Sequence, residues 1–227
     1  MTAQAGGAIP LQCRPADRMA QPIAEVRAER RRLRALRSGL DPAARSAAEA
    51  AIRATLARLG VFRRGRHVAL YLPMPGEVDL RPCLDLARGR GSLVYVPRIV
   101  DGRRRRMLFS PWTAGAARRT NAFGIVEPAA SAGARPVIGL DTVVLPVVGF
   151  DPDGNRLGMG AGYYDRALRR RRDRGAAWRR PRLIGVAYAC QQLDRIPASP
   201  WDVPLDLIVT ERGVIVPRHD PARRHHE

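Results

Sequence analysis

The chain has 227 residues, of which 45% are hydrophobic, so it can bury one sizeable core; no apolar run approaches the ~20 residues of a membrane-spanning helix. Its three cysteines are widely spaced and form no C-x-x-C pair, which excludes a disulfide scaffold and is typical of reduced thiols in a cytoplasmic protein. The formal net charge is +19, but every basic residue is an arginine and the arginine runs contain no interleaved aromatic residues, so we predict no specific nucleic-acid partner.

The predicted elements begin after an N-terminal extension, residues 1–22, which lacks the sustained apolar segment of a signal peptide. A helix is predicted over residues 24–37. A second helix opens at Asp41-Pro42, where a capping side chain precedes a proline at the first helical position, and it ends near Gly60. A strand over 67–72, a helix over 79–87 and a strand over 92–96 follow. Asp101-Gly102 predicts a hairpin turn into a strand over 106–112, and residues 129–136 read as a loop.

The second half continues the alternation of strands and helices. The β-branched run over residues 142–150 predicts a buried strand, and a helix begins near Tyr163 after a glycine-rich stretch. Strands over 183–188 and 206–210 follow, then a hairpin into 214–216 and a polar tail, residues 217–227. This order predicts one domain over residues 23–216 with a three-layer α/β/α, Rossmann-like fold: a mostly parallel sheet with helices on both faces. Ligands of such sheets bind at the carboxyl ends of the strands.

The stretch Asn155-Arg-Leu-Gly-Met-Gly-Ala-Gly-Tyr-Tyr-Asp-Arg166 joins a predicted strand to a predicted helix. Glycines at alternate positions permit positive φ, so that successive N–H groups and the helix dipole can hold an anion such as a nucleotide phosphate. A Rossmann fingerprint would place the third glycine one residue later, and a Walker A loop would need Gly-Lys-Ser/Thr. A plain strand-to-helix connector explains the glycines alone equally well, but not their flanks.

With these flanks the chain resembles the 5-formyltetrahydrofolate cyclo-ligase family, whose loop N-R-L-G-x-G-x-G-Y-Y-D it matches at each fixed position. Further matching segments are residues 71–79, 121–128, 184–188 and 200–211, so the resemblance covers about residues 24–216. It implies the same Rossmann-like fold and ATP-dependent closure of 5-formyltetrahydrofolate to 5,10-methenyltetrahydrofolate, giving ADP and phosphate. Phosphorylation of the formyl oxygen would let N10 attack the formyl carbon intramolecularly, so no covalent nucleophile is expected.

The resemblance also implies the site residues. For ATP they are Arg156, Leu157, Gly158, Met159, Gly160, Ala161, Gly162, Tyr163 and Tyr164. For the folate they are Leu72, Glu77, Met159, Gly160, Ala161, Gly162 and Tyr163; a carboxylate suits the two donors on the edge of a pterin. The Mg²⁺ ligands are Asp165 and Asp202, whereas Asp206 is expected only to pair locally. Phe109, Trp112 and Phe123 are either walls for the flat pterin or core residues.

One departure from the family concerns an N-terminal Lys-x-x-x-Arg pair that reaches the ATP phosphates in relatives. Aligning Leu40-Asp41-Pro42 with the family's Leu-Ser-Pro places Arg30 at the arginine and Val26 at the lysine. Arg27 and Arg31 are candidates to replace the lysine, although arginine is bulkier and forked, and a solvated helix face explains each of them equally well. We expect a monomer with 5-formyltetrahydrofolate and ATP as its partners and no membrane association. A non-catalytic folate- or RNA-binding relative is the alternative.

Overall fold

The structure is a computed structural model that describes residues 23–121, 124–129, 132–172, 180–199 and 201–218. The predictions for residues 1–22 and 219–227 lie outside this part of the chain. Within it, no helix is long and apolar enough to cross a membrane.

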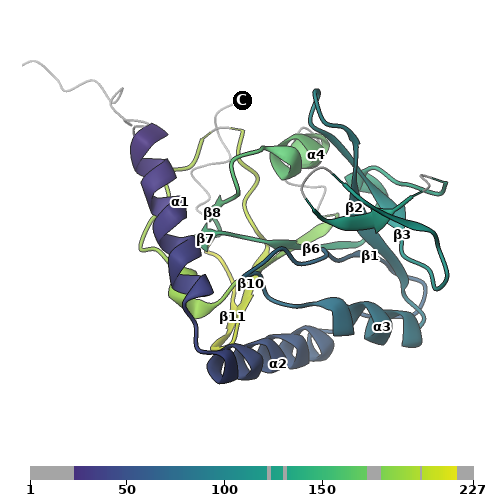
Figure 1. Ribbon diagram of the computed structural model, residues 1–227, viewed down its shortest axis with the longest axis horizontal. Helices are drawn as coiled ribbons and strands as arrows, with labels where there is room; N and C mark the ends of the chain where they lie inside the picture. The colour runs from purple at the N-terminus through teal and green to yellow at the C-terminus, as the bar shows by residue number, and fades with distance from the viewer. Residues whose placement is uncertain (1–22, 122–123, 130–131, 173–179, 200, 219–227) are drawn as a thin grey trace, which may run out of the picture.

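A seven-stranded sheet runs through the centre of the molecule in the order β11-β10-β9-β6-β1-β2-β3 (Figure 1). The strands are β1 (His67–Ala69), β2 (Leu93–Asp101), β3 (Arg106–Pro111), β6 (Thr142–Pro146), β9 (Arg182–Val186), β10 (Leu207–Thr210) and β11 (Gly213–Ile215). All neighbours from β10 to β2 pair in parallel, and only the edge strands β3 and β11 are antiparallel. The predicted mostly parallel sheet is therefore confirmed.

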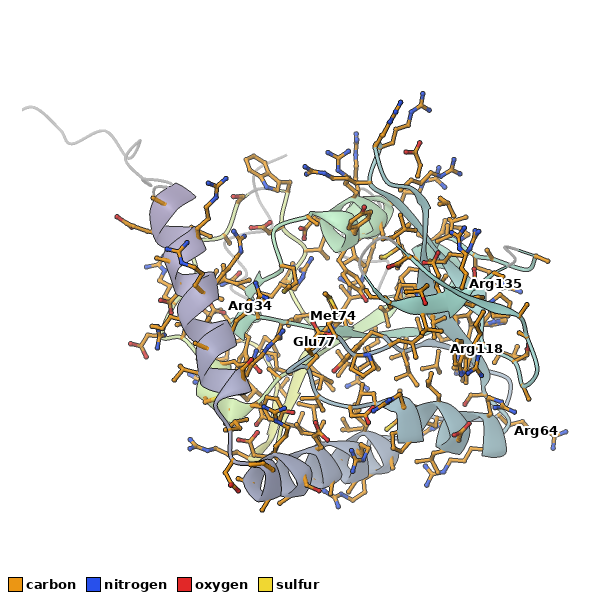
Figure 2. All side chains as sticks on the ribbon, viewed as in Figure 1. Arg34, Arg64, Met74, Glu77, Arg118 and Arg135 are labelled. Carbon is orange, nitrogen blue, oxygen red and sulfur yellow. The ribbon has the colours of Figure 1, made fainter. Side chains whose placement is uncertain are left out.

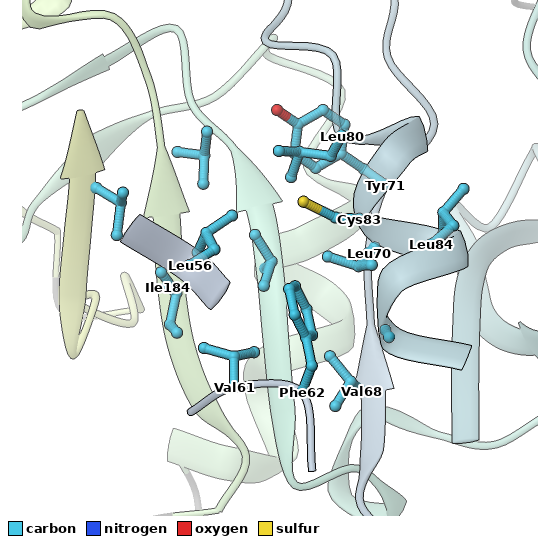
Figure 3. Close-up of a cluster of buried hydrophobic side chains, with 14 of the residues drawn as sticks. Leu56, Val61, Phe62, Val68, Leu70, Tyr71, Leu80, Cys83, Leu84 and Ile184 are labelled. Atoms are coloured by element: carbon cyan, nitrogen blue, oxygen red, sulfur yellow. The ribbon is translucent and has the colours of Figure 1, made fainter. Parts of the chain in front are cut away.

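The two faces of the sheet bury two separate hydrophobic clusters, because successive side chains of a strand point to opposite sides. Val144 and Ile184 belong to the first cluster, which Figure 3 shows, and their strand neighbours Val143 and Leu183 belong to the second. Strands buried on both faces read as continuous apolar runs, which is why the sequence predicts β6 and β9 so clearly.

Helices cover both faces of the sheet, as predicted. α2 (Pro42–Arg58) and α3 (Arg81–Gly89) lie on the first face, and α4 (Tyr163–Arg172) buries Leu168 in the cluster of the second. The predicted cap of α2 is confirmed, since Asp41 Oδ2 accepts hydrogen bonds from the amides of Ala43 and Ala44 at 3.0 and 3.1 Å.

The first helix, α1 (Ile23–Ser38), stands across one end of the sheet beside β7 (Gly149–Phe150) and β8 (Arg156–Leu157) (Figure 1). Leu33 of α1 is fully buried, and a Cβ on Gly149 would lie only 2.6 Å from its Cδ1. Glycine at position 149 thus allows the close approach of helix and strand that holds α1 in place.

Two hairpins differ from the expected pattern. The run over residues 142–150 is not one strand: it forms β6 and then β7, which turns back onto β8. The buried Asp151 makes this turn by accepting hydrogen bonds from the amides of Asp153 and Asn155 and from the Asn155 side chain. The other hairpin, β4 (Arg118–Thr120) with β5 (Val126–Pro128), was not predicted at all. It is held by Glu127, fully buried, which pairs with Arg119 at 2.6 Å.

Candidate active site

The candidate site lies where the order of strands reverses. From β1 the chain proceeds to β2 on one side, whereas β6, on the other side of β1, is followed by β9. The segments after β1 and β6 therefore diverge at the carboxyl ends of these strands, which is where such sheets usually bind their ligands. Glu77 follows β1, the glycine loop (residues 158–162) follows β6 through the β7–β8 hairpin, and Asp202 follows β9.

The glycine loop leads directly into α4, which begins at Tyr163 as predicted. Gly160 and Gly162 adopt positive φ values of 93° and 70°, whereas Gly158 does not. A Cβ built on Gly158 would meet no atom within 4 Å, so the space beside this residue is open. The loop thus combines a left-handed backbone, free space and the N-terminus of a helix, a combination suited to an anion.

Two arginines from distant elements border this loop. Arg30 of α1 donates from Nε to the carbonyl oxygen of Gly158 at 2.9 Å. Arg105, in the turn between β2 and β3, places Nη1 3.9 Å from the position of a Cβ on Gly162, and its own φ of 51° is left-handed. No sequence motif singled out Arg105, because only the sheet brings this turn to the loop.

The two predicted metal ligands lie around one buried guanidinium. Arg156, whose side chain is 6% exposed, donates to Asp165 Oδ1 at 2.5 Å and also to the carbonyl oxygen of Val203. Burial foremost lowers the pKa of Arg156, and the negative charges of Asp165 and Asp202 oppose that shift. Asp202 Oδ2 accepts a hydrogen bond from the amide of Ser199 at 2.8 Å.

The fit of this pair to Mg²⁺ follows from its donor set. Asp165 contacts the Arg156 guanidinium, and Asp202 lies close enough for its charge to act on it; Mg²⁺ is commonly held in proteins by one or two carboxylates together with substrate phosphates and water. No group of three His, Cys, Asp or Glu side chains is clustered for a metal among the described residues, so a site made by protein ligands alone is not indicated there.

Asp206 has the local role expected of it. Its Oδ2 accepts hydrogen bonds from the amide of Leu183 at 2.6 Å and from Arg171 at 2.7 Å, which joins β9, β10 and α4. The hydrogen-bond partners of this carboxylate are thus the Leu183 amide and Arg171.

Glu77 lies buried in the turn that follows β1. Its Oε2 accepts a hydrogen bond from the amide of Met74 at 3.1 Å, and its Oε1 lies 3.8 Å from Nη2 of the equally buried Arg37. Burial raises the pKa of Glu77, while the Met74 amide, Arg37 and Arg34 lower it. Figure 2 shows Arg34, Met74 and Glu77 together between α1 and the sheet. The sequence patterns had singled out neither Arg34 nor Arg37.

Glu77 lies close enough to the first turn of α4 for its charge to act on Tyr164. Burial raises the pKa of Tyr164, in the first turn of α4, and the charge of Glu77 adds to the rise. The same two causes raise the pKa of Tyr71, whose hydroxyl donates to the carbonyl oxygen of Val78 at 2.9 Å. Leu72 is half-buried and packs against the first hydrophobic cluster.

The aromatic candidates have structural uses. Phe109 is 1% exposed within the second cluster, and Trp112 lies under the guanidinium of Arg118 at 4.3 Å. Arg118 is well separated from Glu77 in Figure 2. Packing, the alternative that the sequence left open, therefore describes both side chains. Phe123 lies outside the described residues.

Comparison with known proteins assigns the chain to a family. The sequence profile of the 5-formyltetrahydrofolate cyclo-ligase family matches residues 22–211, most of the chain. The chain belongs to this family. It is 32% identical to the 5-formyltetrahydrofolate cyclo-ligase of Haemophilus influenzae over 79% of this chain and 95% of that protein. The cyclo-ligase of Escherichia coli K12 is also 32% identical, over 65% of this chain and 79% of that protein.

Solved structures from the cyclo-ligase family share the fold. The NMR structure of Aquifex aeolicus 5,10-methenyltetrahydrofolate synthetase superposes with a TM-score of 0.72 at 30% identity, covering 89% of this chain and 97% of that one. The Mycoplasma pneumoniae synthetase gives a TM-score of 0.63 at 26% identity, over 82% and 99% of the two chains. The resemblance stated from the sequence motifs is thereby confirmed.

Among the N-terminal arginines proposed for the family's phosphate-binding pair, only Arg30 contacts the loop. Arg27 and Arg31 are exposed, and neither makes a hydrogen bond or ion pair with another described residue. Arg31 points about 100° around the helix axis from Arg30. The position of the lysine, Val26, is half-buried.

Proposed function

We propose that the protein catalyses the ATP-dependent cyclisation of 5-formyltetrahydrofolate to 5,10-methenyltetrahydrofolate, with release of ADP and phosphate. Family membership supports the reaction, and one structural observation carries the proposal. Glu77, suited to the donor edge of a pterin, follows β1, and the glycine loop, suited to phosphates, follows the neighbouring parallel strand β6 through the β7–β8 hairpin.

The chemistry explains why such a site needs no nucleophilic side chain. The formyl oxygen attacks the γ-phosphorus of ATP and ADP leaves, which converts a resonance-stabilised amide into an activated phosphoryl ester. N10 then attacks the formyl carbon and loses its proton. The C–O bond breaks, phosphate departs with that oxygen, and the N5–C–N10 bridge is left. Holding the reacting groups in register supplies most of the acceleration.

The proposed site residues form two groups, one for ATP and one for the folate. Arg30, Arg156 and residues 157–164 would align the triphosphate, through backbone amides and guanidinium groups. Asp165 and Asp202 would hold Mg²⁺, which neutralises charge on the phosphates when bound. Leu72, Glu77 and residues 159–163 would bind the folate, with the carboxylate accepting hydrogen bonds from the pterin ring.

The decisive assay follows the absorbance of methenyl product from 5-formyltetrahydrofolate with and without ATP and Mg²⁺. We expect product only when both are present, with one phosphate released per turnover. Product without ATP would refute the proposed mechanism. Folate binding without any product would instead favour the alternative of a binding protein that kept the fold.

A further inference from the structure

A buried arginine lies behind the carboxylate proposed for folate binding. Arg37, in the last turn of α1, is 2% exposed, and Glu77 is 9% exposed. The 3.8 Å between Arg37 Nη2 and Glu77 Oε1 makes this a buried ion pair. Taking two charges out of water costs free energy, so a buried ion pair is weak evidence for a gain in stability. The burial of Arg37 beside Glu77 is therefore not explained by stability alone.

The geometry leaves one oxygen of Glu77 available. Oε2 is engaged by the Met74 amide, which closes the turn. No described residue donates a hydrogen bond to Oε1, because Arg37 lies beyond hydrogen-bond distance. Arg37 thus supplies a positive charge close to Oε1 without occupying its lone pairs.

Arg37 itself is enclosed and acts from behind the turn. Its Nε is buried without a hydrogen-bond partner and lies 3.5 Å from the position of a Cβ on Gly76. Gly76 has a φ of 80°, so the turn passes directly over the arginine. A guanidinium that is only 2% exposed can contact almost no solvent or ligand directly, and its nearest carboxylate is Glu77.

The other charged or titratable groups around Glu77 do not duplicate this role. Arg34, one turn earlier on α1, is exposed, so solvent screens its charge. Tyr71 and Tyr164 face the carboxylate from β1's following segment and from α4, and burial keeps both phenols neutral by raising their pKa. Arg37 is the buried cation facing Glu77 within the described part of the chain.

We propose that Arg37 is a positioning residue that keeps Glu77 ionised and leaves its Oε1 free to accept hydrogen bonds from the pterin. The inference rests on the proposed function, because it takes Glu77 as the folate ligand. A protonated carboxyl would lose acceptor strength and turn a donor toward the donor edge of the pterin, so folate binding requires the ionised form.

The test replaces Arg37 by methionine, which keeps the length of the stem and removes the charge. Without Arg37 the desolvated carboxyl is protonated at a higher pH, so affinity falls as the pH decreases and recovers as it rises. Between about pH 9 and pH 6, KM for 5-formyltetrahydrofolate should rise about tenfold more in Arg37→Met than in the unmodified protein. KM for ATP should not follow this profile.

Three further variants separate charge from packing. Arg37→Lys keeps the charge and should restore the pH dependence of KM seen in the unmodified protein. Arg34→Met removes an exposed charge from the same helix and should shift the profile less. Arg58→Met, in the last turn of α2 and away from the site, should leave it unchanged. In a Glu77→Gln background, Arg37→Met should no longer introduce any pH dependence, because no carboxyl remains to titrate.

The outcomes are distinguishable. A KM for folate that rises equally at all pH values in Arg37→Met, and likewise in Arg37→Lys, would overturn the inference and leave a packing role. If Arg37→Met does not fold, carbon NMR of the Glu77 carboxyl in the unmodified protein decides, and a titration midpoint above about pH 7 would overturn it. Absence of methenyl product from the unmodified protein would refute the proposed function instead; equilibrium folate binding would then report on Arg37.

Discussion

At the scale of single residues, the part of the site proposed for phosphates contains a buried cation of the protein's own. Arg156 is held by the Val203 carbonyl and by Asp165, and its side chain is 6% exposed. The charge of this buried arginine therefore offsets part of the negative charge of Asp165 and Asp202 before any ligand binds. Binding of a metal with its phosphates must therefore compete with this arrangement, which makes both aspartates sensitive positions.

Asp165→Asn and Asp202→Asn should each lower kcat by on the order of 100-fold, because the charge that holds Mg²⁺ near the phosphates is halved. The loss should shrink when the Mg²⁺ concentration is raised. Asp153→Asn, an exposed aspartate in the β7–β8 turn, serves as the control and should keep normal rates. Melting curves identify unfolding, since Asp165→Asn also removes a partner of Arg156. Near-normal rates of both variants at low Mg²⁺ would contradict the metal assignment.

At the scale of elements, α1 is part of the site only because it is pressed against the β7–β8 hairpin. Leu33 packs on Gly149, and Arg30, three residues earlier, reaches Gly158 at the end of that hairpin. The contact thus connects hydrophobic packing to the placement of the arginine proposed for phosphate binding.

Gly149→Ala should displace α1, because the new methyl group would lie 2.6 Å from Leu33 Cδ1 in a fully buried contact. We expect a loss of about 1–3 kcal/mol in the free energy of unfolding and a raised KM for ATP. Leu33→Val, which shortens the opposing side chain, should recover part of both losses in the double variant. Gly89→Ala in α3, where a Cβ meets nothing within 4 Å, is the matched control. Unchanged stability in Gly149→Ala would show that α1 is not held there.

The glycine loop is predicted to act through its backbone, and two of its glycines test this differently. Gly158→Val adds a side chain into open space at a residue without positive φ, so it should abolish nucleotide binding without changing the melting temperature. Gly160→Val should also abolish binding, but with a backbone strain of about 1–3 kcal/mol because of its positive φ. Calorimetry with an ATP analogue and melting curves measure both. Normal nucleotide binding by Gly158→Val would make the loop only a connector.

At the scale of the whole molecule, the net charge of +19 creates a positive field that no single motif concentrates. Such a field attracts any polyanion through release of counterions, and the attraction weakens steeply with salt. It would also favour the encounter with the ATP proposed as a substrate.

We predict DNA binding that is independent of sequence and falls by on the order of tenfold or more between about 0.05 and 0.2 M salt. Fluorescence anisotropy with two unrelated duplexes measures it, and the methenyl assay run across the same salt range shows whether folate turnover follows. A strong preference for one duplex, persisting at the higher salt, would instead reveal a specific nucleic-acid site.

Much of this protein could be predicted from sequence alone because its signals are local. The apolar runs predicted β6, β9 and β10, Asp41-Pro42 fixed the start of α2, and the spaced glycines with their flanks indicated both the loop and the family. Each of these depends on residues within a few positions of one another. The short β4–β5 hairpin was not predicted, because it depends on Glu127, which accepts a hydrogen bond from the amide of Ile99 in the distant strand β2.

Which residues lie at the proposed site was decided by the tertiary structure. Because β1, β6 and β9 are neighbouring parallel strands, the segments that carry Glu77, the glycine loop and Asp202 all follow strands at the same edge of the sheet, although they lie far apart in the sequence. Only packing selects Arg30 over Arg27 and Arg31, and only burial distinguishes Arg37 from the other arginines of α1. Arg27, Arg30, Arg31 and Arg37 are the same residue type on the same helix, so the sequence alone cannot tell them apart. Local motifs could indicate the reaction. Which charges are removed from water, and therefore interact strongly, depends on the neighbours that the fold places around them.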